Sequence, residues 1–239
     1  MEKEKELSEF VKRLKEAAGE NLRAVVLYGS GVDDDFREHS GLNILCLLQR
    51  LTGDALESIR ATALWWWRKG HPAPLVFTLE ELRNSADVFS IELLDMKARH
   101  RMLEGSDFLS TLEVPTALHR LQVERELRTN VIRLRQSFLR CPGQRSELAD
   151  LMMASASSFG TLFRHALIAM GQDAPKSYRA AADQLGILLA LDTAAFHRVM
   201  DLREGKSAVG EMDLGKIFAA YLDLVVKAAE EIDRRWAGS

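Results

Sequence analysis

Apolar residues at the start of the chain recur at helical spacing and then give way to a continuous apolar run. In residues 3–18 the apolar side chains lie three or four positions apart: Leu7, Phe10, Val11, Leu14 and Ala18. This spacing places them on one face of a helix. Residues 22–28, LRAVVLY, are apolar or β-branched almost throughout and end at Gly29-Ser30-Gly31. They predict a buried strand followed by a tight turn.

The next seventy residues alternate between strand-like and helix-like segments. Residues 42–48, LNILCLL, predict a second buried strand after a polar loop over residues 33–40. A helix is expected over residues 54–69, because Gly70 is a favoured C-cap and two prolines follow it. Residues 74–78 predict a third strand, and Thr78 is placed to cap a short helix over residues 79–88. Residues 89–94, FSIELL, have strand composition again.

The pattern changes after Pro115. Segments with a period near 3.6 occupy about residues 116–140, 146–170, 176–185, 193–202 and 211–236, and Gly, Pro or Asp separates them. They predict five helices packed as a bundle. The expected fold class is therefore α+β, with a mixed sheet and flanking helices in a domain over residues 1–113 and an all-α bundle over residues 114–239.

Composition excludes several classes of protein. The chain has 239 residues, 47% of them hydrophobic and 28% charged, which is typical of a globular protein. A formal net charge of -3 provides no general attraction to nucleic acid or to anionic lipid, so neither is expected as a partner. No apolar stretch approaches the ~20 residues that span a bilayer, and the charged start MEKEKELSEF is unlike a signal peptide. We therefore expect a cytoplasmic protein.

Cysteine and histidine give no sign of a disulfide framework or a metal site. The two cysteines, Cys46 and Cys141, are expected to be unpaired. The six histidines are scattered singly and none has a partner at zinc-ligand spacing. A zinc site is therefore not expected.

The residues around the first predicted turn resemble those of a known enzyme family. A Gly-Ser turn after a strand can hold phosphate groups through its backbone amides and its hydroxyl. The span LYGSGVDDDFREHSGLNILCLL resembles the nucleotidyltransferase family, typified by the kanamycin and lincosamide nucleotidyltransferases. Gly29 and Ser30 match the family's turn, and Ser40 matches the serine of its later Ser-Asp-x-Asp motif. The resemblance covers about residues 20–105 and implies nucleotide binding.

The chain departs from the family at the metal ligands. In the family, the two aspartates of the motif hold divalent ions and a third carboxylate on a later strand activates the acceptor. Here Gly41 and Asn43 occupy the two aspartate positions. Glycine has no ligand atom, and asparagine offers one neutral oxygen in place of a charged carboxylate. Glu92 matches the third carboxylate, with Asp95 as a less well placed substitute.

Three hypotheses follow from this comparison. The leading one is a degenerate nucleotidyltransferase-fold protein that binds a nucleotide or another anionic ligand between its two domains, without efficient transfer and without a cofactor. The second is a divergent active enzyme that uses Glu92 and Mg²⁺ held by Asp33, Asp34 or Asp35. The third is a structural module that binds a protein partner. For Glu92 a surface role is an equal alternative.

Two further features concern binding and assembly. Arg128 and Arg135 lie seven residues apart on one edge of the first bundle helix and could bind an anion, although salt bridges are the more common role of such residues. Trp65, Trp66 and Trp67 point about 100° apart on a helix, so they cannot all face one core. An exposed tryptophan is typical of a protein contact, and we expect a homodimer.

Overall fold

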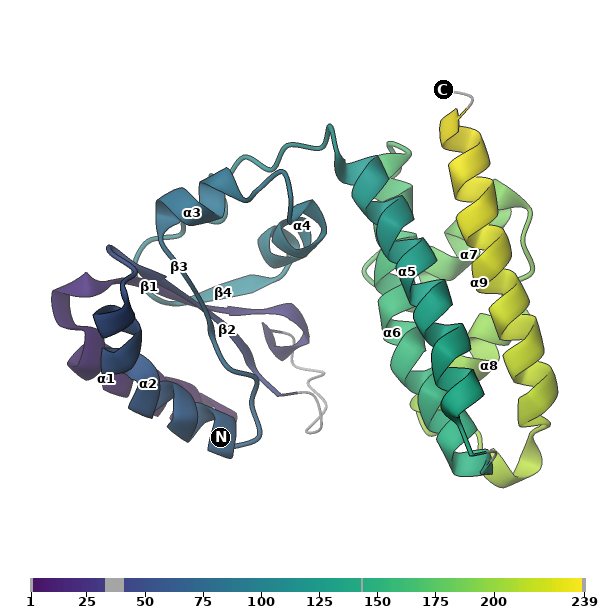
Figure 1. The fold of residues 1–239 in the computed structure, drawn as a ribbon, viewed down its shortest axis with the longest axis horizontal. Helices are drawn as coiled ribbons and strands as arrows, with labels where there is room; N and C mark the ends of the chain where they lie inside the picture. Colours follow the sequence, from purple (N-terminus) through teal and green to yellow (C-terminus); the bar gives the residue numbers. More distant parts are fainter. Residues whose placement is uncertain (1, 33–40, 143, 238–239) are drawn as a thin grey trace. The chain divides into compact units, whose positions relative to one another are not determined.

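A computed structural model of the chain describes residues 2–32, 41–142 and 144–237. The chain divides into two compact units, Met1–Pro115 and Thr116–Ser239. The first unit contains a mixed four-stranded sheet with helices, and the second is helical (Figure 1). The predicted α+β fold class, with a sheet domain followed by a helical bundle, is confirmed.

The sheet of the first unit has the order β3-β2-β1-β4. Its strands are β1 (Leu22–Tyr28), β2 (Asn43–Leu48), β3 (Leu75–Phe77) and β4 (His100–Glu104). β1 is antiparallel to both β2 and β4, whereas β2 and β3 are parallel. In this register Tyr28, at the end of β1, pairs with Asn43 on one side and with His100 on the other.

Each face of the sheet is covered by a pair of helices, as Figure 1 shows. The helices α1 (Glu2–Ala18) and α2 (Gly53–Arg68) cover one face and share a core with Val25, Leu27, Ile44 and Cys46. The helices α3 (Leu79–Asn84) and α4 (Ser90–Ala98) cover the other face, where Ala24, Val26, Leu45 and Leu47 are buried. Alternate residues of β1 and β2 therefore point into different cores, which explains why both strands are continuously apolar.

The boundaries of α2 and α3 follow their capping residues. The Thr52 side chain accepts a hydrogen bond from the Ala55 amide at the start of α2, and Gly70 follows the end of the helix with a φ of +88°. Thr78 and Glu81 form a capping box at the start of α3. The predicted helices over residues 54–69 and 79–88 are confirmed, although α3 already ends at Asn84.

The predicted strand over residues 89–94 is wrong. Residues 90–94 belong to α4, where Ser90, Ile91, Leu93 and Met96 are buried, and Phe89 precedes the helix. The six apolar letters FSIELL are too few to distinguish a strand from a buried helix, and the following DMKA continues the helix. The fourth strand is β4, whose sequence HRMLE has no strand-like composition.

In the part of the second unit that the structure describes, five α-helices match the periodic segments of the sequence. They are α5 (His119–Arg140), α6 (Arg145–Ala169), α7 (Tyr178–Leu189), α8 (Ala194–Arg203) and α9 (Leu214–Ala237). Their core contains the rings of Phe159, Phe163, Phe196 and Tyr221. Among the described residues, no helix is long and apolar enough to cross a membrane.

The three adjacent tryptophans have three different environments. Trp66 is completely buried and its ring lies 4.7 Å from that of Phe10. Trp65 is partly buried, with the Arg13 guanidinium 4.7 Å from its ring centre. Trp67 keeps 61% of its surface exposed. The prediction that they cannot share one core is confirmed.

Candidate functional site

The turn after β1 is shaped by glycine. Gly29 has a φ of +74°, a left-handed conformation that side chains with a Cβ rarely adopt. Its backbone amide donates to the carbonyl of Arg99 at 3.0 Å, which ties the turn to the residue before β4. The chain then forms a short 3-10 turn, Gly29–Val32. The turn that the sequence predicted is present, but one of its amides is already hydrogen-bonded within the protein.

A positive charge lies at this turn. Lys3 of α1 reaches it, and the Lys3 ammonium donates to the carbonyl of Gly31. Lys3 is partly buried. The turn therefore has a cation beside it. Sequence alone could not place Lys3 there, because the two segments are far apart in the chain.

Asn43 lies directly beside the turn. It is the first residue of β2 and is half-buried. A Cβ placed on Gly29 would be 3.5 Å from the Asn43 side-chain nitrogen. The structure thus brings Gly29 and Asn43 together, as the family pattern implies, and presents a neutral amide where that pattern has a carboxylate.

Gly41, at the other aspartate position, has no space for a side chain. A Cβ on Gly41 would be 2.6 Å from Cδ of Pro72, 3.2 Å from the carbonyl oxygen of Gly70 and 3.3 Å from Cα of His71. Contacts below 3.0 Å are essentially never seen for a real Cβ, so the chain would have to move. The segment after α2 therefore closes over this position.

His71 fixes that closing segment to its surroundings. Its Nδ1 accepts a hydrogen bond from the Leu42 amide at 3.2 Å, so the neutral ring carries its proton on Nε2. Nε2 then donates to Glu6 at 3.2 Å. The ring also lies 4.0 Å from that of the buried Trp66. Contacts to α1, α2 and the start of β2 thus hold the segment against Gly41.

Glu92, which matches the third carboxylate of the family pattern in sequence, is not on the strand that was expected. Glu92 lies in the first turn of α4 and is exposed, rather than on a strand of the sheet. Asp95, the substitute, is half-buried on the same helix. The remaining candidate carboxylates, Asp33, Asp34 and Asp35, lie outside the described residues, as does Ser40.

The two arginines proposed for anion binding belong to α5 in the second unit. Arg128 donates to Glu124 at 2.8 Å and to Asp233 at 2.6 Å. The hydrogen bond to Glu124 is the main cause that raises the pKa of Arg128. Arg135 is exposed. Arg128 is thus already engaged by two carboxylates that an anion would have to displace.

Two polar residues beside the turn were missed by the sequence analysis. Tyr28 ends β1, and burial raises the pKa of its hydroxyl. His100 begins β4, with Nε2 3.1 Å from Asp107 and Nδ1 3.1 Å from the carbonyl of Met96. A hydrogen bond from the Ser110 amide, followed by that from His100, lowers the pKa of Asp107. His100 could not be found because β4 itself carries no sequence signal.

The described residues at the two aspartate positions of the family pattern carry no carboxylate, because Gly41 has no side chain and Asn43 is an amide. Glu92 lies on a helix. Within the described parts of the chain, no group of three or more His, Cys, Asp or Glu side chains is arranged to hold a metal ion.

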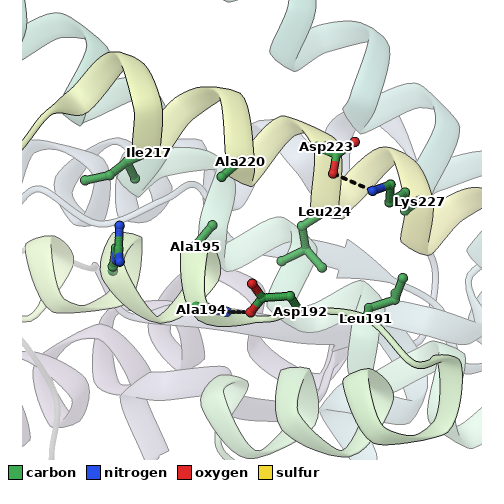
Figure 2. Close-up of a pocket in the computed structure, with 10 residues that line it drawn as sticks. Leu191, Asp192, Ala194, Ala195, Ile217, Ala220, Asp223, Leu224 and Lys227 are labelled. Atoms are coloured by element: carbon green, nitrogen blue, oxygen red, sulfur yellow. Dashed lines mark hydrogen bonds and ion pairs between the residues drawn. The ribbon is translucent and has the colours of Figure 1, made fainter.

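The second unit contains a separate cavity of about 200 Å³. It is lined by α8, α9 and the loop before α8, with alanines on its walls (Figure 2). Asp223 and Lys227 at its rim pair with each other at 2.8 Å, and Asp192 accepts from the Ala194 amide at 2.9 Å. None of the residues predicted to bind a ligand lines this cavity.

Comparison with known proteins identifies the fold. No protein-family model matches the chain, and no match was found among curated proteins. Among solved structures, the chain is similar to spectinomycin adenyltransferase AAD(9) from Enterococcus faecialis, crystallised with ATP and spectinomycin. The TM-score is 0.56 at 12% sequence identity, over 94% of this chain and 98% of that one. The chain therefore has a nucleotidyltransferase-like fold.

Proposed function

We propose that this protein is a degenerate member of the nucleotidyltransferase fold, which binds a nucleotide or another anionic ligand at the turn after β1 without efficient nucleotidyl transfer. The observation that carries the proposal is the enclosure of Gly41 by Pro72, His71 and Gly70. An aspartate cannot be accommodated there without moving the chain. The loss of the carboxylate is therefore built into the packing of the first unit.

The expected loss of activity is large. Metal ions in such sites stabilise the transition state by several kcal/mol, and each ~1.4 kcal/mol changes the rate tenfold. Asn43 can offer a metal ion only a neutral oxygen. Transfer through the usual pair of ions would therefore be slower by several orders of magnitude.

Ligand binding can survive this loss because it depends on other groups. The Lys3 ammonium, which donates to the carbonyl of Gly31, supplies a positive charge beside the turn after β1. A positive charge there favours an anion. The solved structure of similar fold contains ATP, which supports a nucleotide as the first ligand to test.

A transfer assay tests the proposal. The full chain is incubated with labelled ATP or GTP, Mg²⁺ or Mn²⁺, and a panel of acceptors that includes spectinomycin, aminoglycosides, lincosamides and protein side chains. We expect no transfer above the protein-free background. Transfer that Glu92→Ala abolishes would replace the proposal by the divergent enzyme, with Glu92 as its base.

Assembly is a separate proposal. The homodimer expected from the sequence does not depend on which ligand binds, and its failure would leave the ligand proposal intact.

A further inference from the structure

An apolar stripe on α2 remains exposed. Leu56, Leu64 and Trp67 keep 47%, 42% and 61% of their surface accessible. The opposite side of the helix carries Ile59 and Trp66, which are buried in the core shared with α1. At 100° per residue, the three exposed side chains lie within about 80° of one another. Together with the exposed Arg60, which lies between Leu56 and Leu64, they form one surface, here called the α2 stripe.

The α2 stripe has a negative side chain beside its N-terminal end and a positive one beside its C-terminal end. Glu57 lies next to Leu56 near the start of α2, and Arg68 lies next to Trp67 at its end. Both fall on the same flank of the stripe, because they are about 20° apart around the helix axis. They are eleven residues apart, or roughly 16 Å along the axis, so they cannot pair within one chain.

The charges beside the α2 stripe of one copy can pair with those of a second copy. When two copies of α2 lie antiparallel about a two-fold axis, residues on the same flank of each helix meet across the contact. If Leu56 of one copy faces Trp67 of the other, Glu57 falls within about 3 Å of Arg68 of the second copy along the axis, and the pair occurs twice. Antiparallel helix dipoles favour the same orientation.

Arg60 would lie near the two-fold axis of this arrangement and constrains the contact. Arg60 lies in the centre of the stripe, where the two copies of its charge would approach each other. Its guanidinium is paired with Glu57 of its own helix at 3.2 Å, and this pair can persist in the dimer. Arg60 is also within reach of the second copy's tryptophan ring, a favourable partner for a guanidinium.

We propose that the α2 stripe is the contact surface of a homodimer, in which two copies of α2 pack antiparallel and the Glu57 and Arg68 side chains pair between copies. The contact is small. A helix of 16 residues is about 24 Å long, and a single helix pair buries less than the ~1,600 Å² of a standard interface. We therefore expect a dissociation constant of about 10 µM or weaker, rather than a permanent dimer.

Sedimentation velocity of the full chain over a concentration series measures this equilibrium. Wild-type protein should shift from monomer to dimer as its concentration rises. Trp67→Glu should raise the dissociation constant by about tenfold or more, because it replaces the largest apolar side chain of the stripe with a charge that would face Leu56 of the second copy. Circular dichroism should show an unchanged fold, since Trp67 is exposed.

Charge exchange tests the orientation of the two helices. Glu57→Arg and Arg68→Glu should each weaken the dimer, because each places like charges opposite one another. The double variant Glu57→Arg with Arg68→Glu should recover most of the affinity. Because the two positions cannot meet within one chain, this recovery can arise only between copies.

A substitution outside the α2 stripe serves as the control for these variants. Leu139→Glu changes another exposed leucine, on α5 in the second unit, and should leave the dissociation constant unchanged. A protein that stays monomeric up to about 500 µM would overturn the proposal. So would a dimer that ignores Trp67→Glu, a double variant no tighter than the singles, or a dimer that Leu139→Glu dissociates.

Discussion

Gly41 shows how a single residue type can be required by packing rather than by chemistry. Its absent side chain allows Pro72 to lie where a Cβ would be only 2.6 Å from the proline Cδ. The sequence revealed that a metal ligand was missing here. It could not reveal that the position is filled, because Pro72 is distant in the chain and only the fold brings it to Gly41.

This close approach predicts the effect of restoring the aspartate. Gly41→Asp should lower the free energy of unfolding by about 2–3 kcal/mol, because the new side chain overlaps the closing segment. Adding Pro72→Ala, which removes the Cδ atom, should recover part of that loss. Asn43→Asp is the matched control and should cost less than about 1 kcal/mol, since its site already holds a side chain. Urea denaturation measures all four proteins, and a stable Gly41→Asp would contradict the enclosure.

A second residue, Glu204 in the bundle, predicts a dependence of stability on pH. Hydrogen bonds from Arg179, followed by that from Lys206, lower the pKa of Glu204 from 4.5 to about 2. A lowered pKa in the folded state means that the ionised group stabilises the fold above pH 4.5, and that this contribution is lost as the pH falls toward 2.

Glu204→Gln should therefore destabilise the protein by about 1–2 kcal/mol at pH 7, and the difference from wild type should shrink between pH 4.5 and 2. Denaturation at a series of pH values measures it. Glu16→Gln, at an exposed residue of α1, is the control and should show a much smaller difference. A difference that stays constant down to pH 2 would show that the charge of Glu204 is not responsible.

At the scale of elements, the sequence predicted those helices and strands whose own residues mark them, and it failed for those that depend on contacts with distant residues. β1 and α2 were predicted within a residue of their observed bounds, because a continuous apolar run or a capped periodic segment marks them. α4 was mistaken for a strand, and β4 was missed. Residues of β4 are all only partly buried, so tertiary pairing with β1, rather than composition, makes it a strand.

The contact between α6 and α7 supports a prediction at this scale. A Cβ on Gly160 of α6 would be 2.6 Å from the ring of Tyr178 on α7. Gly160→Ala should therefore destabilise the bundle by about 1–3 kcal/mol, despite the better helix propensity of alanine. Gly215→Ala in α9 meets only a distant carboxylate oxygen at 3.6 Å and should be neutral or slightly stabilising. Equal melting temperatures for the two variants would contradict the close packing.

At the scale of the whole molecule, the change from mixed to purely helical periodicity after Pro115 marked the change of architecture. The structure has the sheet on one side of that change and helices on the other. The candidate site was less predictable. Gly29 and Asn43 could be placed together from the family pattern, whereas Lys3 and His100 reach the turn only through the fold. Glu92 was misplaced because its helix was taken for a strand.

The most direct test of the central claim is the effect of magnesium on ATP binding, measured by calorimetry with the full chain in Mg²⁺ and in EDTA. A fold that retains the turn but lacks the metal-binding carboxylates should bind ATP weakly, with affinities in the two conditions that agree within about threefold. Binding that strengthens by more than about tenfold in Mg²⁺ would demonstrate a working metal site and contradict the account.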